Sequence, residues 1–264
     1  MSDSVTVRIE DGIATVEMNE PNRLNAFSPS IIAGLREAFS DLESSDARCV
    51  VMTGAGRAFS AGGDIDEQLE LIESDRSLDD RMRSTLERRG NRLIETVVDF
   101  PLPTVAKING PAVGGGANLA IACDIQLASS AASIGFVFRQ VGLSVDMGSS
   151  ALLPDLVGRN VAKELVFRGT ILSADEALEL GLVNHVYDEA EFDDRVATVV
   201  DEISSGPTIA LTHAKQALNR GANTTVQEAL RTEALSQGIV FETDDHEEGV
   251  RAFLADRNPE FRGE

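Results

Sequence analysis

Two glycine-rich stretches carry the clearest chemical signal in the sequence. Gly114-Gly115-Gly116 follows the apolar run Thr104–Ile108, and Gly62-Gly63 follows the run Cys49–Thr53. Glycine allows backbone angles that other residues avoid, and it lets a ligand approach the main chain closely. A helix that begins at such a turn presents free N–H groups and the positive end of its dipole, which suits a phosphate or an oxyanion. Taken alone, each stretch is equally consistent with close packing of the chain.

Two common nucleotide-binding motifs are absent from these turns. The triple glycine lacks the G-x-G-x-x-G spacing of a dinucleotide-binding turn, and no acidic residue is placed to bind a ribose. No P-loop lysine follows either turn, so nucleotide hydrolysis is not indicated. An oxyanion site therefore stays the chemical hypothesis for these two turns.

The overall charge excludes several kinds of partner. The 264 residues include 44 acidic and 23 basic side chains, which give a net charge of -21. A surface this acidic repels nucleic acid and anionic membranes, so neither is an expected partner and an RNA-binding role is disfavoured. Salt screens such self-repulsion, which favours a halophilic protein in a high-salt cytoplasm. An ordinary acidic protein is the alternative.

Composition points to a globular protein of the cytoplasm without a bound metal. Hydrophobic residues make up 42% and charged residues 25% of the chain, and no apolar run is long enough to cross a bilayer. The amino-terminal residues do not resemble a secretory signal. Cys49 and Cys123 lie inside apolar runs and are typical of small buried hydrophobic residues. The three histidines, His185, His213 and His246, are more typical of surface or structural positions.

Periodicity predicts an α/β protein that positions the two turns. A hairpin is expected first, then repeated strand and helix units to about residue 190, and then helices. The expected strands are Val5–Ile9, Ile13–Met18, Cys49–Thr53, Thr104–Asn109, Asp124–Ala128 and Val183–Tyr187. The expected helices are one after Ser28-Pro29, one over Leu78–Val98, a short buried one after the triple glycine, several between residues 148 and 181, and four over 190–204, 207–220, 224–241 and 244–255. We divide the chain into a core, residues 1–200, and a helical C-terminal region, residues 201–264.

Several motifs together resemble the crotonase, or enoyl-CoA hydratase/isomerase, superfamily over nearly the whole chain. The segments that carry the resemblance are Val16–Phe27, Gly54–Ile65, Pro103–Gly116, Leu119–Asp124, Gly142-Leu143 and Phe241–Leu254. The resemblance implies a spiral of ββα units with a C-terminal helical trimerisation region. It also implies a homotrimer or a dimer of trimers.

The resemblance further implies an acyl-CoA thioester as the substrate, with no metal or redox cofactor and with CoA arriving as part of the substrate. The main-chain N–H groups of Gly63 and Gly115 would form an oxyanion hole for the thioester carbonyl, stabilising an enolate. Other matched positions would contact CoA: Leu24, Ala26, Ala61, Asp64 and Ile65. Phe253 and Arg257 would reach CoA from the C-terminal region, either of the same chain or of a neighbouring subunit. Core packing for Phe253 and a solvated side chain for Arg257 are the alternatives.

Two positions depart from the pattern of the family's hydratases. Those enzymes use two glutamates, one just after the triple glycine and one 20 residues later, where this chain has Asn118 and Phe138. Neither side chain can transfer a proton, and hydration needs one group to activate water and another to supply a proton. We expect Phe138 to contact substrate instead, and Asn118 to hydrogen-bond the substrate or Asp146, or to fill space.

Asp146, eight residues beyond Phe138, is the remaining candidate acid and base. Its position resembles that of the single acidic residue in ring-1,2-epoxyphenylacetyl-CoA isomerases and related Δ3,Δ2-enoyl-CoA isomerases. One carboxylate suffices for an isomerase, and apolar neighbours would raise its pKa toward the working pH.

Other roles are open for Asp146 and for the protein. Asp146 could cap a helix beginning near Gly148, or act as the nucleophile of an aryl-CoA dehalogenase-like enzyme. Such dehalogenases also use a histidine and a tryptophan, and this chain has no tryptophan. A hydratase with a non-standard acid and base and a non-catalytic CoA-binding protein are further alternatives. The sequence favours the isomerase.

Overall fold

A six-stranded sheet forms the centre of the molecule. The structure is a computed structural model that describes residues 3–221 and 224–264. The strand order is β1-β2-β3-β4-β6-β9; β1 and β2 form an antiparallel hairpin and the remaining neighbours are parallel. Their bounds are β1 (Val5–Glu10), β2 (Ile13–Met18), β3 (Cys49–Gly54), β4 (Thr104–Ile108), β6 (Ile125–Ser129) and β9 (His185–Tyr187). A smaller sheet joins β5 (Ala112–Val113), β7 (Ser133–Gly135) and β8 (Ile171–Ser173).

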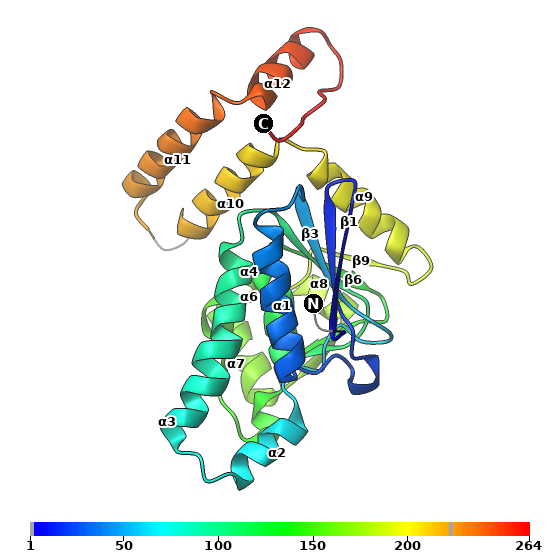
Figure 1. The fold of residues 1–264 in the computed structure, drawn as a ribbon, viewed down its shortest axis with the longest axis vertical. Helices are drawn as coiled ribbons and strands as arrows, with labels where there is room; N and C mark the ends of the chain where they lie inside the picture. Colours follow the sequence, from blue (N-terminus) through cyan, green and yellow to red (C-terminus); the bar gives the residue numbers. More distant parts are fainter. Residues whose placement is uncertain (1–2, 222–223) are drawn as a thin grey trace.

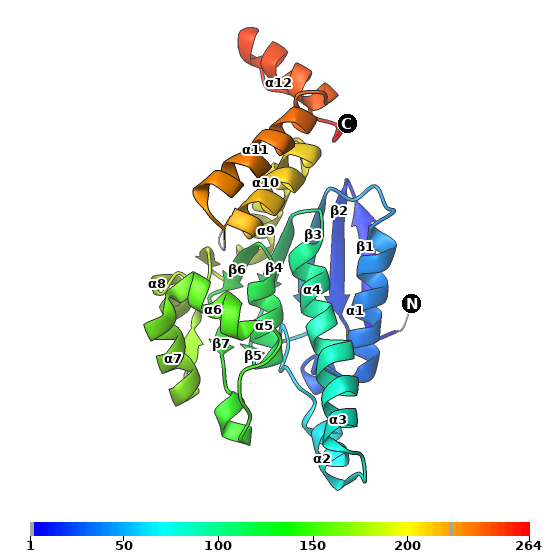
Figure 2. The same cartoon turned by 90° about the vertical axis from the view of Figure 1, so that its left-hand side faces the viewer.

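Helices cover both faces of the large sheet. Successive side chains of β3 alternate between two hydrophobic clusters, because strand side chains point to opposite faces: Val50 and Met52 join the larger cluster, while Cys49 and Val51 join the smaller one. The helix α9 (Phe192–Ser204) covers the smaller cluster. Figure 2 shows α1 and α4 along the other face. The helices around the larger cluster are α1 (Pro29–Leu42), α4 (Arg92–Asp99), α5 (Gly115–Ala122), α6 (Ser149–Val157), α7 (Arg159–Arg168) and α8 (Ala174–Glu179).

A helical excursion between β3 and β4 extends from one end of the molecule. It comprises α2 (Ile65–Glu73), α3 (Leu78–Arg81) and a π-helical stretch, Met82–Asn91, that continues into α4. The long helix expected over residues 78–98 is thus present, but its middle has π-helical bonding. Two short 3-10 turns, Pro21–Arg23 and Phe138–Val141, lie in loops of the core.

Three C-terminal helices form an arm at the opposite end. Figures 1 and 2 show α10 (Thr208–Gly221), α11 (Val226–Val240) and α12 (Asp244–Leu254) extending away from the sheet. Lys215 of α10 is buried and pairs with Asp124 at 2.8 Å. The guanidinium of Arg48 also donates to the Thr208 hydroxyl and to the Gly206 carbonyl, at 2.8 and 2.6 Å. These contacts hold the base of the arm on the core.

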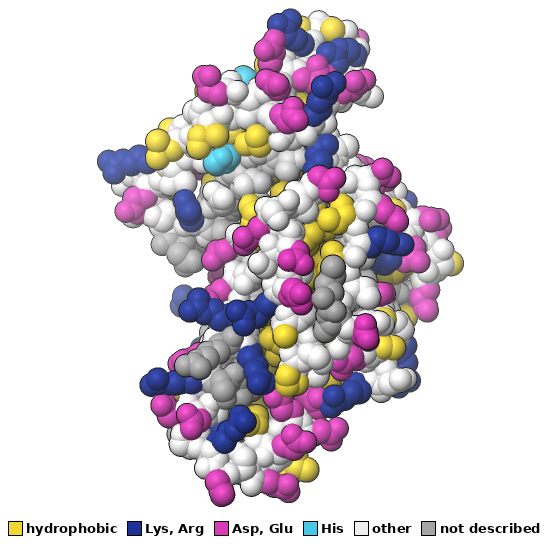
Figure 3. Space-filling view, viewed as in Figure 1, with side chains coloured by type: hydrophobic (Ala, Val, Ile, Leu, Met, Phe, Trp, Pro, Cys, Tyr) yellow, Lys and Arg dark blue, Asp and Glu magenta, His cyan; other side chains and the backbone are white. Residues whose placement is uncertain are grey.

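The outer surface is strongly acidic. Figure 3 shows aspartate and glutamate side chains spread over most of one face, with lysine and arginine side chains between them. Within the described residues, no helix is long and apolar enough to cross a membrane. Cys49 and Cys123 are buried and unpaired, as expected, and burial raises the pKa of the Cys49 thiol to about 12.

Most of the expected elements are confirmed, and the exceptions are short. The hairpin, the central strands and the four C-terminal helices lie within a few residues of their predicted bounds. The strands β5, β7 and β8 were not predicted, because two or three residues show no periodicity. The proposed division after residue 200 falls inside the continuous helix α9, and it stays a prediction.

Candidate active site

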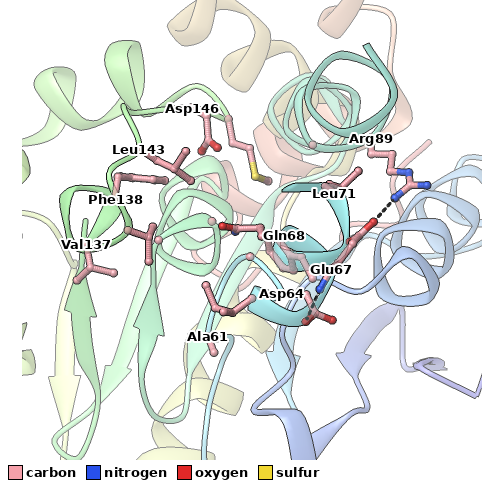
Figure 4. A pocket seen from close by; sticks show the side chains of 18 of the residues that line it. Ala61, Asp64, Glu67, Gln68, Leu71, Arg89, Val137, Phe138, Leu143 and Asp146 are labelled. Atoms are coloured by element: carbon pink, nitrogen blue, oxygen red, sulfur yellow. Dashed lines mark hydrogen bonds and ion pairs between the residues drawn. The ribbon is translucent and has the colours of Figure 1, made fainter. Parts of the chain in front are cut away.

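A cavity of about 530 Å³ lies between the helical excursion and the loop that follows β7. Its walls are mainly apolar and come from α2, from the end of the π-helical stretch and from the segment around Phe138 and Asp146. Both glycine turns border it through Gly63 and Gly115. Figure 4 shows Asp146, Phe138 and Gln68 among the side chains that line it. A cavity of this size and polarity suits a small organic group better than a metal ion or a nucleic acid. In the part of the chain that the structure describes, no cluster of metal-binding side chains is present.

The two glycine turns are packed directly against each other. The Val113 N–H donates to the Ser60 carbonyl at 3.0 Å, and the Ser60 N–H donates to the Pro111 carbonyl at 3.1 Å. A Cβ placed on Gly62 would lie 2.8 Å from the Gly115 nitrogen. Segments about 50 residues apart in the sequence therefore meet at one point, as the oxyanion hypothesis requires. Gly115 is the first residue of α5, so its N–H has no acceptor within the helix.

Three consecutive glycines are needed at the start of α5 for different reasons. Gly114 has a φ of +55°, a conformation that side chains disfavour. A Cβ on Gly115 would lie 3.0 Å from the ring of Phe27. A Cβ on Gly116 would lie 2.3 Å from the Ser60 carbonyl oxygen, which is main chain and cannot move away. Close packing and an N–H group without an acceptor in the helix are thus both properties of this turn.

Asp146 lies at the cavity, half-buried, in the tight turn before α6. Burial raises the pKa of its carboxyl to about 6. Met147 and Gly148 both have positive φ, 44° and 78°, and such conformations are often found at functional sites. The helix α6 begins at Ser149 without a side-chain cap, so the alternative in which Asp146 caps this helix is wrong.

The side chain of Asn118 hydrogen-bonds to Asp146 from outside the cavity wall. Its side-chain amide donates to the main-chain oxygen of Asp146 at 3.0 Å and to the carboxylate at 3.4 Å. Asn118 is fully buried and is not part of the cavity wall, and its Oδ1 has no partner among the described residues. Phe138 is buried and lines the cavity. The two positions that hold glutamates in hydratases therefore provide an amide behind Asp146 and an aromatic wall.

The positions expected to contact CoA are only partly at the cavity. Ala61, Asp64 and Ile65 border it. The carboxylate of Asp64 already has partners, because it caps α2 by accepting from the Asp66 and Glu67 N–H groups and pairs with Arg23. Leu24 and Ala26 do not line it, and the Leu24 carbonyl accepts from the Ala61 N–H at 2.8 Å.

Phe253 and Arg257 do not line the cavity of their own chain. Phe253 is 86% exposed on α12, and the guanidinium of Arg257 makes two bonds to Glu248, at 2.6 and 2.8 Å. Figure 1 places α12 at the end of the molecule opposite α2. Phe253 and Arg257 could therefore contact CoA only in a neighbouring subunit's site, and that contact stays a prediction.

Several polar residues at the cavity were not predicted. Gln68 and Glu67 come from α2, and Arg89 comes from the π-helical stretch, where it pairs with Glu67 at 2.7 Å. The polar, arginine-rich sequence of residues 66–92 gives no sign of which side chains face inward. The position of Gln68 four residues after the cap Asp64 is the one available signal, because these residues lie one helical turn apart.

Comparison with known proteins agrees with this geometry. The model of the enoyl-CoA hydratase/isomerase family matches residues 8–264. The chain is 34% identical over 269 residues to the 1,2-epoxyphenylacetyl-CoA isomerase of Escherichia coli strain K12, with 100% of both chains covered. It is 33% identical over 259 residues to the short-chain-enoyl-CoA hydratase of Clostridium acetobutylicum, with 97% of each chain covered.

A solved structure supports the same relationship. The enoyl-CoA hydratase of Bacillus anthracis matches with a TM-score of 0.92 and 30% identity, over 99% of this chain and 100% of that one. Isomerases and hydratases match at nearly the same identity, so the comparisons do not separate the two activities.

Proposed function

We propose a function from one premise: the chain belongs to the enoyl-CoA hydratase/isomerase family. Its α/β fold is the crotonase fold, and an acyl-CoA substrate follows from the family. Within the family, the protein acts as an isomerase that moves a double bond in an acyl-CoA. Gly63 and Gly115 hold the thioester oxygen, and Asp146 moves the proton.

The arrangement around Asp146 carries this proposal. Of the carboxylates that line the cavity, Asp64 and Glu67 are paired with arginines, whereas burial raises the pKa of Asp146 to about 6. The two hydratase glutamates are replaced by Asn118 and Phe138. Hydration needs a second group to activate water, whereas isomerisation returns the same proton to a different carbon. A pKa near the working pH lets one group act first as a base and then as an acid.

The reaction has two proton transfers. The carboxylate of Asp146 removes a proton from C2 of a 3-enoyl-CoA, and the electron pair moves to the thioester oxygen, giving a dienolate. The N–H groups of Gly63 and Gly115 donate to that oxygen, where the negative charge is largest. The protonated Asp146 then returns the proton to C4, and the electrons form the C2–C3 double bond. Atoms and charge balance without a further reactant.

The CoA part of the substrate extends along two neighbouring segments, one with Leu24 and Ala26 and the other with Ala61, Asp64 and Ile65. The arm of a neighbouring subunit completes this site with Phe253 and Arg257, in a homotrimer or a dimer of trimers. The acyl group is a straight 3-enoyl chain or a ring. The ring is supported by the relative named 1,2-epoxyphenylacetyl-CoA isomerase, and by a mainly apolar cavity of about 530 Å³.

The test is the variant Asp146→Asn assayed with 3-hexenoyl-CoA, 1,2-epoxyphenylacetyl-CoA and crotonyl-CoA. The amide keeps the shape but cannot accept the proton, so we expect kcat for isomerisation to fall by at least about 1000-fold. Asp155→Asn, an exposed position on α6, is the matched control and should retain wild-type activity. Rapid hydration of crotonyl-CoA by the wild type, or unchanged turnover by Asp146→Asn, would contradict the proposal. Binding of CoA esters without any turnover would indicate a non-catalytic protein.

A further inference from the structure

The carboxamide of Gln68 is a polar group in a mainly apolar cavity. In the part of the chain that the structure describes, it makes no hydrogen bond to any side chain or main-chain group. An amide in such a place keeps two N–H donors available for a bound molecule. The proton transfers by Asp146 and the main-chain donors Gly63 and Gly115 do not involve this group.

Helix geometry directs Gln68 toward the oxyanion site. Its N–H donates to the Asp64 carbonyl at 3.0 Å, so it lies in the first turn of α2, and helical side chains lean toward the N-terminus of their helix. Gly63 lies at that end. A Cβ placed on Gly63 would be 2.7 Å from Gln68 Nε2, which is the nearest atom to it. The amide is therefore beside the main chain that provides one of the two oxyanion donors.

The charged side chain next to Gln68 on α2 points in a different direction from Gln68. Figure 4 shows Gln68 pointing across the cavity toward Val137 and Phe138, while Glu67 points the other way, to Arg89. Glu67 directly precedes Gln68 on α2, and its carboxylate forms an ion pair with Arg89 at 2.7 Å. A neutral amide, and not a carboxylate, thus faces the place where the thioester oxygen would become negative.

We propose that Gln68 is a third hydrogen-bond donor to the thioester oxygen, acting beside the N–H groups of Gly63 and Gly115. The inference rests on the proposed function, because it uses the same thioester site. A donor aimed at a developing charge binds the enolate more tightly than the neutral thioester. Gln68 therefore contributes to stabilising the enolate and contributes little to binding the substrate in its ground state.

Two ligands of equal length test this difference by binding alone. Hexanoyl-CoA carries a neutral thioester, and 3-oxohexanoyl-CoA is acidic enough to bind as its enolate, whose ultraviolet absorption can be followed directly. We expect Gln68→Met to weaken binding of 3-oxohexanoyl-CoA by about 10- to 100-fold and to change binding of hexanoyl-CoA by less than about threefold. Gln68→Glu has nearly the same shape without the donors, and it should weaken enolate binding at least as much. Glu70→Gln, exposed on the same helix, is the control and should bind both ligands as the wild type does.

Equal losses for both ligands, or an unchanged affinity for 3-oxohexanoyl-CoA, would overturn the role of Gln68. Thermal unfolding measured by circular dichroism shows whether each variant is folded, and Gln68→Glu carries the test if Gln68→Met is not. The binding measurement needs no turnover. A wild type that fails to convert 3-hexenoyl-CoA would therefore disprove the proposed isomerase without deciding the result for Gln68.

Discussion

At the scale of single residues, the carboxyl of Asp146 sets a pH dependence. Burial raises its pKa to about 6, and only the ionised form can accept the first proton. We therefore expect kcat/KM for a 3-enoyl-CoA to rise about tenfold per pH unit below pH 6 and to level off above it. Initial rates between pH 5 and 8 at constant ionic strength measure this. A flat profile over that range would show that Asp146 is not the base.

The same pKa predicts a stability change. The folded carboxyl keeps its proton up to about pH 6, whereas the unfolded one releases it near 3.8, so stability falls as the pH rises from about 3.8 to 6 and the full cost is present above pH 6. Because Asp146 is partly exposed, we expect Asp146→Asn to stabilise the fold by about 1 kcal/mol at pH 8. At pH 4 the gain should largely disappear. Urea unfolding at the two pH values tests the sign, and a variant less stable at pH 8 would contradict it.

The residues of the candidate site could be predicted where the main-chain conformation needs a particular residue type, or where a family pattern is broken. Gly63 and Gly115 were identified because turns leave a glycine pattern in the sequence, and the structure places both at the cavity. Asp146 was found because it lies eight residues beyond Phe138, where the family's hydratases have a glutamate. Gln68 and Arg89 were missed, because the faces of a charged helix and of a π-helical stretch cannot be assigned from composition.

At the scale of elements, the two glycine turns respond differently to an added methyl group. In Gly116→Ala, the Cβ would lie 2.3 Å from the Ser60 carbonyl oxygen, so we expect a loss of about 3 kcal/mol in unfolding free energy. In Gly63→Ala, the nearest atom is the flexible end of Gln68, and the loss should be below about 1 kcal/mol. Chemical denaturation of both variants makes the comparison. Equal losses would mean that the turns are not packed as described.

The attachment of α10 to the sheet depends on a buried ion pair. The carboxylate of Asp124 accepts from the Thr104 N–H and hydroxyl, at 2.7 and 2.8 Å, and pairs with Lys215 at 2.8 Å. Removing the cation in Lys215→Met leaves a partly buried carboxylate without its counter-charge. We expect a loss of about 2–3 kcal/mol, below the range for fully buried pairs because the Asp124 side chain is 25% exposed.

A double-mutant cycle measures this pair. Asp124→Asn together with Lys215→Met should cost less than the sum of the two single variants, since no unpaired charge remains. Additive losses would show that the pair contributes no coupling. Limited proteolysis of Lys215→Met reports whether the arm has become loose, with cleavage expected near residues 204–208 before the core is cut.

Element types were predictable where an apolar pattern extended over at least five residues. The continuous apolar run Cys49–Thr53 predicts a buried strand, and the structure places its side chains alternately in two clusters. The spacing of the apolar residues in α1 predicts its buried face. No such pattern fits into β5 or β8, which exist because neighbouring segments pair with β7. The π-helical bonding of residues 82–91 likewise depends on packing and not on composition.

At the scale of the whole molecule, the net charge of -21 predicts a dependence on salt. Repulsion among the acidic side chains opposes the compact state, and the screening length falls from about 10 Å at 0.1 M salt to about 3 Å at 1 M. We expect the melting temperature to rise by more than about 5 °C between 0.1 and 2 M KCl. A melting temperature independent of salt would identify an ordinary acidic protein and would remove the halophilic hypothesis.

The arm exposes several large apolar side chains to solvent. Leu235 of α11 is 75% exposed, and Phe253 and Leu254 of α12 are 86% and 79% exposed. Figure 3 shows a row of hydrophobic side chains along the α10–α11 part of the arm. Contiguous exposed patches of this kind are typical of interfaces between proteins. An interface here agrees with the trimer that the family resemblance implies, and we expect light scattering to give a mass of about three chains, or about six if trimers pair.

Charge placed on this surface should separate the subunits and lower activity together. Leu235→Glu with Phe253→Glu should shift the mass toward one chain of 28.2 kDa while the far-ultraviolet circular dichroism stays unchanged. Gln237→Glu adds a charge at an exposed position of α11 without removing apolar area, and it should leave the oligomer intact. If Phe253 and Arg257 complete a neighbour's CoA site, the separated chains should show a raised KM for the acyl-CoA. A monomeric wild type at micromolar concentration, or separated chains with an unchanged KM, would contradict a shared site.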